Sequence, residues 1–250
     1  MRTLPLIVCS LHGLAAAAGA TTTAHLLSGG DLSQDWSNIG LITVNDDWSG
    51  IPGIMGYRGD DAALGTGVDP STIVADYSAV TDVNANQANP NTFTTGGVTE
   101  FHLANPVVAL TGSGTADVPH LVLYLDATGM QAITISYDLL DIDGSTDNAV
   151  QPVALQYRLG GSGNYTNLSM VTDASEGPGL ATAVFPVSAT LPSGADNQSL
   201  LEIRILTTNA VGNDEWIGVD NIRVTAAPVP EPASAGIFAL AGMAVFRRRR

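Results

Sequence analysis

The stretch Ile133–Leu139 reads Ile-Thr-Ile-Ser-Tyr-Asp-Leu, and apolar and polar residues alternate along all of it. Successive side chains of a β-strand point to opposite faces of a sheet, so this alternation predicts a strand with one buried face. The same alternation recurs in residues 153–159 and 201–205. We therefore expect residues 26–225 to form one all-β domain.

Turn residues separate the alternating stretches, as in Asp143-Gly144-Ser145, Glu176–Gly179 and Pro192–Asn197. Short strands joined by such turns predict an antiparallel, jelly-roll-like β-sandwich. The region Leu41–Thr99 is less regular. Within it we predict that Asn84–Asn91 forms a loop.

The last alternating stretch changes its parity. Ile217 and Val219 fall on one face of a regular strand, whereas Ile222 and Val224 fall on the other. One extra residue would bring all four to the same face, so we predict a β-bulge at Asp220-Asn221.

The N-terminal segment has the order of a secretory signal. Arg2 precedes an apolar run that extends to Ala18, and Ala18-Gly19-Ala20 provides small residues for cleavage. This pattern predicts a signal helix over residues 1–20, with cleavage directed by Ala18 and Ala20. The alternative is a buried N-terminal helix, although the segment lacks an amphipathic period.

The C-terminal segment, residues 228–250, combines prolines, an apolar run from Ala233 to Phe246 and four arginines. As a helix this run would be about 21 Å long, shorter than the hydrocarbon core of about 30 Å. The arginines would remain on the cytoplasmic side. We therefore expect a short apolar helix that inserts transiently into the inner membrane.

The order of these features, beginning with Val229, Pro230, Glu231 and Pro232, resembles the PEP-CTERM sorting signal. The resemblance implies an exosortase-type sorting protease as partner and cleavage near the Pro-Glu-Pro motif. It also implies export to the cell surface or extracellular matrix of a Gram-negative-type bacterium. It leaves open whether the tail is cleaved or kept as an anchor.

The middle of the chain is similar to an accessory β-sandwich of secreted bacterial proteins. The resemblance rests on Asp47–Asp60, Asn89–Val98 and Asn213–Ile222. In some of those proteins the module is attached to extracellular nuclease or phosphatase domains. We expect no separate enzyme domain in this chain, so the resemblance does not imply nuclease activity here.

The composition is strongly acidic. The chain has no lysine, and outside the two targeting segments four arginines face 23 of its 24 Asp and Glu residues. Such a surface repels polyanions, so we expect no direct nucleic acid binding. The one cysteine, Cys9, lies in the signal segment, which leaves no disulfide in the mature domain.

Two oxygen-rich segments suggest structural Ca²⁺. Asp220 and Asn221 lie in a final strand similar to those of carbohydrate-binding jelly rolls, in which the Asp often serves calcium. Asp141, Asp143 and Asp147 form a second candidate, because calcium prefers several hard oxygen ligands. The alternatives are an Asp and Asn that cap a turn by local hydrogen bonds, and an ordinary polar turn.

Trp36 and Trp48 stand among polar residues. They are candidates for a ligand-binding platform on which sugar rings stack. The alternative is that each plugs one end of the sandwich.

We assign no catalytic residue. Asp214, Glu215 and Asp220 offer carboxylates for acid–base chemistry, but the strand motif of β-sandwich glycosidases is absent. The sequence therefore favours a non-catalytic, exported β-sandwich that binds or packs with extracellular polysaccharide. The alternatives are a secreted glycoside or phosphoester hydrolase and a self-associating structural surface protein.

Overall fold

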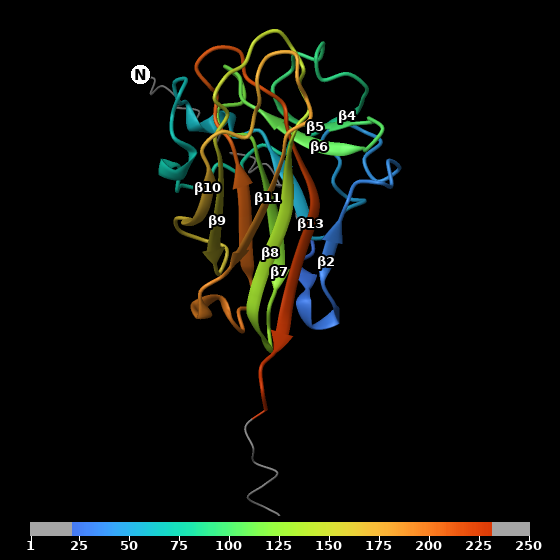
Figure 1. The fold of residues 1–250 in the computed structure, drawn as a ribbon. Coiled ribbons are helices and arrows are strands. Elements are labelled where there is room, and N and C mark those ends of the chain that lie inside the picture. The colour runs from blue at the N-terminus through green and yellow to red at the C-terminus, as the bar shows by residue number, and fades with distance from the viewer. Residues whose placement is uncertain (1–21, 232–250) are drawn as a thin grey trace, which may run out of the picture.

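The computed structural model describes residues 22–231, and this part of the chain is an all-β sandwich (Figure 1), as the sequence predicts. Ala18, Ala20, Pro232 and both expected terminal helices lie outside the described residues. The strands are β1 (His25–Leu26), β2 (Leu32–Gln34), β3 (Ile54–Tyr57), β4 (Asn84–Gln87), β5 (Gly97–Phe101), β6 (Val107–Thr111), β7 (His120–Asp126), β8 (Met130–Asp141), β9 (Val153–Leu159), β10 (Thr166–Val171), β11 (Val184–Thr190), β12 (Leu201–Leu206) and β13 (Ile217–Pro228).

Two sheets pack face to face. Sheet A has the order β1-β7-β12-β9-β10, with β3 also paired to β7, and sheet B has the order β11-β8-β13-β6-β5-β4, with β2 also paired to β13. From β7 onward the chain crosses between the sheets several times, which gives the jelly-roll-like arrangement. Short 3-10 helices, η1 (Leu27–Gly29), η2 (Asp60–Ala62), η3 (Pro70–Thr72) and η4 (Ser193–Ala195), occur in the connections.

The alternation in the sequence decides which side chains enter the core. In β8, Ile133, Ile135 and Leu139 are fully buried and Tyr137 nearly so, whereas the residues between them are partly exposed. Leu201, Ile203 and Ile205 of β12 face the same core from sheet A. Burial of such side chains contributes about 1.5–3 kcal/mol each, so the alternation is also the main source of stability.

The predicted bulge in β13 is confirmed. Pairing with β8 shifts register between Asp220 and Arg223, and Asn221 adopts a left-handed backbone conformation with φ of 51°. As a result Ile217, Val219, Ile222 and Val224 are all completely buried.

The prediction of a loop over Asn84–Asn91 is wrong for its first half. Asn84–Gln87 forms β4, which pairs in parallel with β5. Asn86 interrupts the register with φ of 58°, and the Asn84 amide donates to the Val98 carbonyl. The β1–β7 pair is also parallel, so the sheets are not purely antiparallel.

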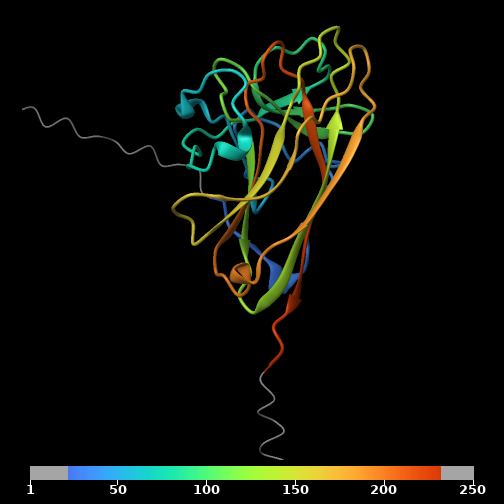
Figure 2. The same ribbon diagram turned by 60° about the vertical axis from the view of Figure 1, so that its left-hand side comes forward.

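The two ends of the sandwich differ (Figures 1 and 2). One end, called here the loop end, carries the connections 88–96, 112–119, 142–152, 172–183 and 207–216; β13 leaves the sandwich at the opposite end, the tail end. Val229, Pro230 and Glu231 of the predicted sorting motif follow β13 there and are exposed. Within residues 22–231 no helix is long and apolar enough to cross a membrane.

Replacing Asn221 tests the bulge. Asn221→Val should lower the free energy of unfolding by about 1–2 kcal/mol, because a β-branched residue is strained at positive φ. Asn221→Gly should cost less, although it also loses the hydrogen bond from the Asn221 amide to Asp138. Urea unfolding measures both, and equal losses would show that backbone strain does not govern this position.

Candidate functional site

A hollow of about 330 Å³ lies at the loop end, where connections distant in sequence meet. We call it the loop-end pocket. Its lining includes Asn91, Phe93, Asp143, Asn213, Asp214 and Trp216. These residues come from three connections, so the pocket exists only in the folded chain.

One buried side chain holds two of these connections together. Gln151 is fully buried, and its amide nitrogen donates to Thr207 Oγ1 at 2.6 Å and to the Thr208 carbonyl at 2.8 Å. Its amide oxygen accepts from the Glu215 backbone N–H at 3.3 Å. Gln151 therefore joins the connection that precedes β9 to the connection that carries Asn213, Asp214 and Trp216.

Glu215 reinforces the same junction. Its side chain is 1% exposed, and Oε1 accepts from the Ala149 N–H at 3.1 Å. Burial, followed by repulsion from Asp143, Asp141 and Asp147, raises the pKa of Glu215 to about 7. Glu215 thus stabilises the contact between the two connections through its carboxyl group. It is not among the residues that line the pocket.

The pocket has an aromatic side. The rings of Phe93 and Trp216 lie 5.8 Å apart, and Trp216 packs edge-on against Phe101 with centroids 5.0 Å apart. The indole N–H donates to the Phe93 carbonyl at 3.2 Å, which fixes the ring between the two connections. Trp216 is only 3% exposed and belongs to the core, so the partly exposed Phe93 ring is the apolar surface that the pocket offers. An aromatic ring beside polar groups suits the apolar face of a sugar.

Two carboxyl groups supply the charge of the pocket. Asp214 Oδ1 accepts from the Ala210 N–H at 2.6 Å, and burial raises the pKa of Asp214 to about 6. Asp143 accepts from the Ser145 N–H at 3.1 Å, and burial raises its pKa as well. The desolvation of both groups favours a ligand that donates hydrogen bonds to them.

The candidate calcium ligands Asp141 and Asp147 already accept hydrogen bonds from other groups of the protein. Asp141 accepts from the backbone N–H groups of Asp143 and Glu176, and Asp147 accepts from the Asn213 amide. Within residues 22–231 no group of three or more His, Cys, Asp or Glu side chains is arranged to hold a metal ion. Calcium binding at these residues stays a prediction.

Asp220 and Asn221 are likewise engaged in hydrogen bonds. Asp220 accepts from the Asn105 amide at 2.8 Å and from the Asn221 N–H at 2.7 Å. The Asn221 amide donates to Asp138 at 2.9 Å. This pattern corresponds to the alternative of local capping at the bulge.

The expected stacking platform at Trp36 and Trp48 is not formed. Their side chains are 3% and 4% exposed, and the rings pack edge-to-face with centroids 6.5 Å apart. Their indole N–H groups donate to the carbonyls of Val219 and Asp82. Both residues therefore pack in the core, in line with the alternative of a plug, and the exposed-platform interpretation is corrected.

The three carboxylates considered for catalysis do not share the pocket. Asp214 lines it, Glu215 lies buried behind it, and Asp220 is paired with Asn105 at the bulge. Sequence reasoning identified Asp143 and Asp214 but missed Phe93, Asn91 and Trp216 as their neighbours. The signal in the sequence for these neighbours was their position: they lie in connections between strands, beside Gly, Pro and Asn residues that are typical of turns.

A larger hollow of about 560 Å³ is lined by residues of the connections 142–152 and 207–216, by residues 67–69, and by Met170 and Thr172. Its wall is mainly aliphatic, and the exposed side chains of Val150, Met170 and Val211 form part of it. It offers few groups for specific recognition, so the loop-end pocket is the better candidate site.

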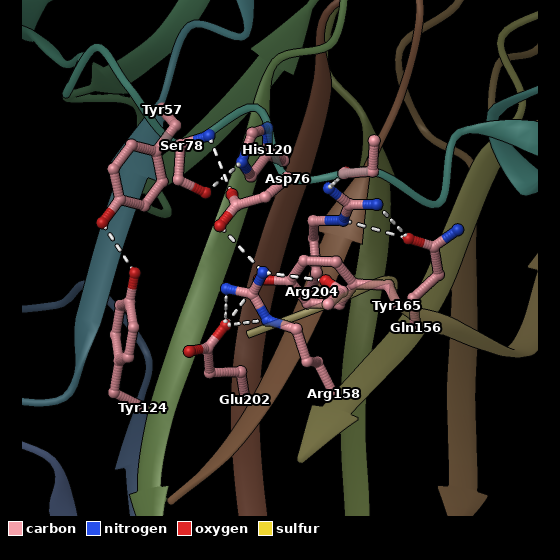
Figure 3. Close-up of polar contacts among 12 residues, drawn as sticks. Tyr57, Asp76, Ser78, His120, Tyr124, Gln156, Arg158, Tyr165, Glu202 and Arg204 are labelled. Carbon is pink, nitrogen blue, oxygen red and sulfur yellow. Dashed lines mark hydrogen bonds and ion pairs between the residues drawn. The ribbon is translucent and has the colours of Figure 1, made fainter. Parts of the chain in front are cut away.

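A second concentration of polar side chains lies on the outer face of sheet A (Figure 3). Arg158 pairs with Glu202 at 2.5 Å and with Asp76 at 2.8 Å, and the Tyr165 hydroxyl donates to Glu202 at 2.7 Å. Arg204 donates to Gln156 and to the carbonyls of residues 73 and 75.

This cluster is buried beneath the segment 58–80. Arg204 and His120 are fully buried, and Glu202 is 2% exposed. His120 donates to the Val118 carbonyl and accepts from Ser78, and burial lowers the pKa of His120 to about 3, so the ring is neutral. The cluster attaches the covering segment to the sheet, and of its charged groups Asp76 is the one that is substantially exposed.

No protein-family model matches the chain, and no curated protein matches it. Among solved structures, the K1 adhesin domain of Lys-gingipain from Porphyromonas gingivalis W83 is 14% identical, with 80% of this chain and 99% of that chain covered and a TM-score of 0.42. A non-crystalline-cellulose-specific carbohydrate-binding module, CBM28, is 14% identical, with 57% and 98% covered and a TM-score of 0.37. At these scores neither likeness carries an argument about function.

The raised pKa of Glu215 makes stability depend on pH. Between its unfolded pKa of about 4.5 and its folded pKa of about 7 the folded state retains a proton that the unfolded chain releases, so stability falls as pH rises. Glu215→Gln keeps an acceptor for Ala149 and should raise Tm at pH 8 and weaken the decline of Tm between pH 5 and 7. Thermal unfolding across this range tests it, and parallel Tm curves for both proteins would contradict it.

The buried cluster predicts a contrast between the two acidic partners of Arg158. Glu202→Gln should lower the free energy of unfolding by about 3 kcal/mol, because it removes one partner of a buried ion pair. Asp76→Asn should cost under about 1 kcal/mol, because the Asp76 side chain is 44% exposed. Urea unfolding compares them, and an equal cost would refute the assignment of Glu202 as the buried anchor.

Proposed function

We propose that this chain is an exported, non-catalytic β-sandwich that binds extracellular polysaccharide through the loop-end pocket. One observation carries the proposal: Phe93 and Trp216 meet Asn91, Asp143 and Asp214 around a single hollow. The partly exposed Phe93 ring, supported by the buried Trp216, suits the apolar face of a sugar, and the carboxyl and amide groups suit its hydroxyl groups. Loops on a rigid β scaffold commonly carry such sites.

The proposed location follows from the two ends of the chain. A signal peptide would export the protein, and an exosortase-type protease would process the tail after transient insertion into the inner membrane. The exposure of Val229, Pro230 and Glu231 beyond β13 supports access of a protease to this segment. The loop end lies opposite the tail end (Figure 2), so attachment through the tail would leave the loop-end pocket facing outward.

A glycan-binding screen of the processed protein from its native host tests the function. Asn91→Ala should weaken binding about fivefold, because loss of one hydrogen bond costs about 1 kcal/mol. Asn91 is exposed and its side chain makes no hydrogen bond within residues 22–231, so the fold should be unaffected. Asn164→Ala is the control, since Asn164 is also exposed and lies outside the pocket lining.

Absence of binding to every glycan would refute the proposal. The screen is run in calcium and in chelator, because structural calcium remains part of the hypothesis. Turnover of glycosides and phosphoesters, and concentration-dependent light scattering, measured on the same sample distinguish the hydrolase and the self-associating alternatives.

A further inference from the structure

The loop-end pocket has an unusual charge balance. Among the lining residues described, two are acidic, Asp143 and Asp214, and none is arginine, lysine or histidine. Asp214 accepts one hydrogen bond, from Ala210, and no donor in the described part of the chain reaches its Oδ2. Asp143 also lines the pocket, with only 9% of its surface exposed. The pocket therefore holds desolvated negative charge without a cation of its own.

The surroundings increase this charge. Asp143, Asp141 and Asp147 all lie close enough to Glu215 for their repulsion to raise its pKa, after the larger effect of burial. Every arginine in residues 22–231 is engaged elsewhere: Arg58 with Asp60, Arg158 with Glu202, Arg204 with Gln156 and Arg223 with Asp31. A hollow surrounded by one sign of charge concentrates ions of the opposite sign.

The aromatic side of the pocket suits the same kind of ligand. Ammonium groups are attracted to the faces of Trp and Phe rings, and this attraction grows when the site excludes water. The Phe93 ring, which is partly exposed and packs on the buried Trp216, lines the pocket together with the two carboxyl groups. Two carboxyl groups and an aromatic ring around one hollow form a chemically coherent site for an amine carried on a sugar ring.

We propose that the loop-end pocket selects polysaccharides that carry free ammonium groups, such as deacetylated amino-sugar chains, over their neutral or carboxylated counterparts. This inference rests on the proposed glycan-binding function and names its ligand class. The ammonium group lies between Asp143 and Asp214, and the ring that bears it lies against the aromatic side.

Glucosamine oligomers and N-acetylglucosamine oligomers of matched length test the selection by isothermal titration calorimetry. The two probes differ only in the charge and acetylation of the amine. The free amine should bind at least about tenfold more tightly at low salt, with a smaller advantage at high salt. Asp143→Asn and Asp214→Asn should each reduce the advantage, because they remove charge and keep the oxygen that accepts a backbone N–H.

Asp126→Asn is the matched control. Asp126 accepts a backbone N–H two residues ahead, from Thr128, as Asp143 does from Ser145, but it lies at the tail end. An equal loss in this variant would assign binding to overall charge and overturn the inference. Equal affinity for the two probes would also overturn it and leave glycan binding standing, whereas failure of every glycan to bind would refute both.

Discussion

The candidate site depends on the buried amide of Gln151. Connections between strands carry backbone groups that need hydrogen-bond partners, and water cannot supply them where the loops pack together. Gln151 provides two donors and one acceptor for the segments that contain Thr207, Thr208 and Glu215. Its backbone also accepts from Ala174 and donates to Asp173, so a third connection is held by the same residue.

On the outer face of sheet A, charged side chains provide the hydrogen-bond partners for the backbone of a covering segment. The segment 58–80 covers this face, and the carbonyls of Ile73 and Ala75 accept from Arg204. Gln156 accepts from Arg204 and donates to the Ile73 carbonyl and to Asn167. The polar residues of β9 and β12 therefore stabilise the cover and are not available to a ligand, and recognition is left to the loop end.

Buried acidic side chains are concentrated at the loop end of the sandwich. Burial places Asp141, Asp143, Asp214 and Glu215 at the loop end with raised pKa values, which costs stability at neutral pH. Carboxyl groups with strongly shifted pKa values are often found at functional sites of proteins. Arg58, Arg158 and Arg223, in contrast, form ion pairs outside the pocket lining. The fold thus separates its structural ion pairs from the uncompensated charge at the pocket.

The sequence by itself determined the all-β class, the buried faces of β8 and β12 and the bulge at Asp220-Asn221, because these follow from the two-residue period of a strand. Only the tertiary structure decided that Glu202 and Arg204 are buried, since a polar residue on an outer face looks alike whether water or a distant segment covers it. It also decided that Trp36 and Trp48 pack in the core and that Asn91, Phe93 and Trp216 meet Asp143 and Asp214. Contacts between separate connections depend on how the two sheets pack, and no local period in the sequence encodes them.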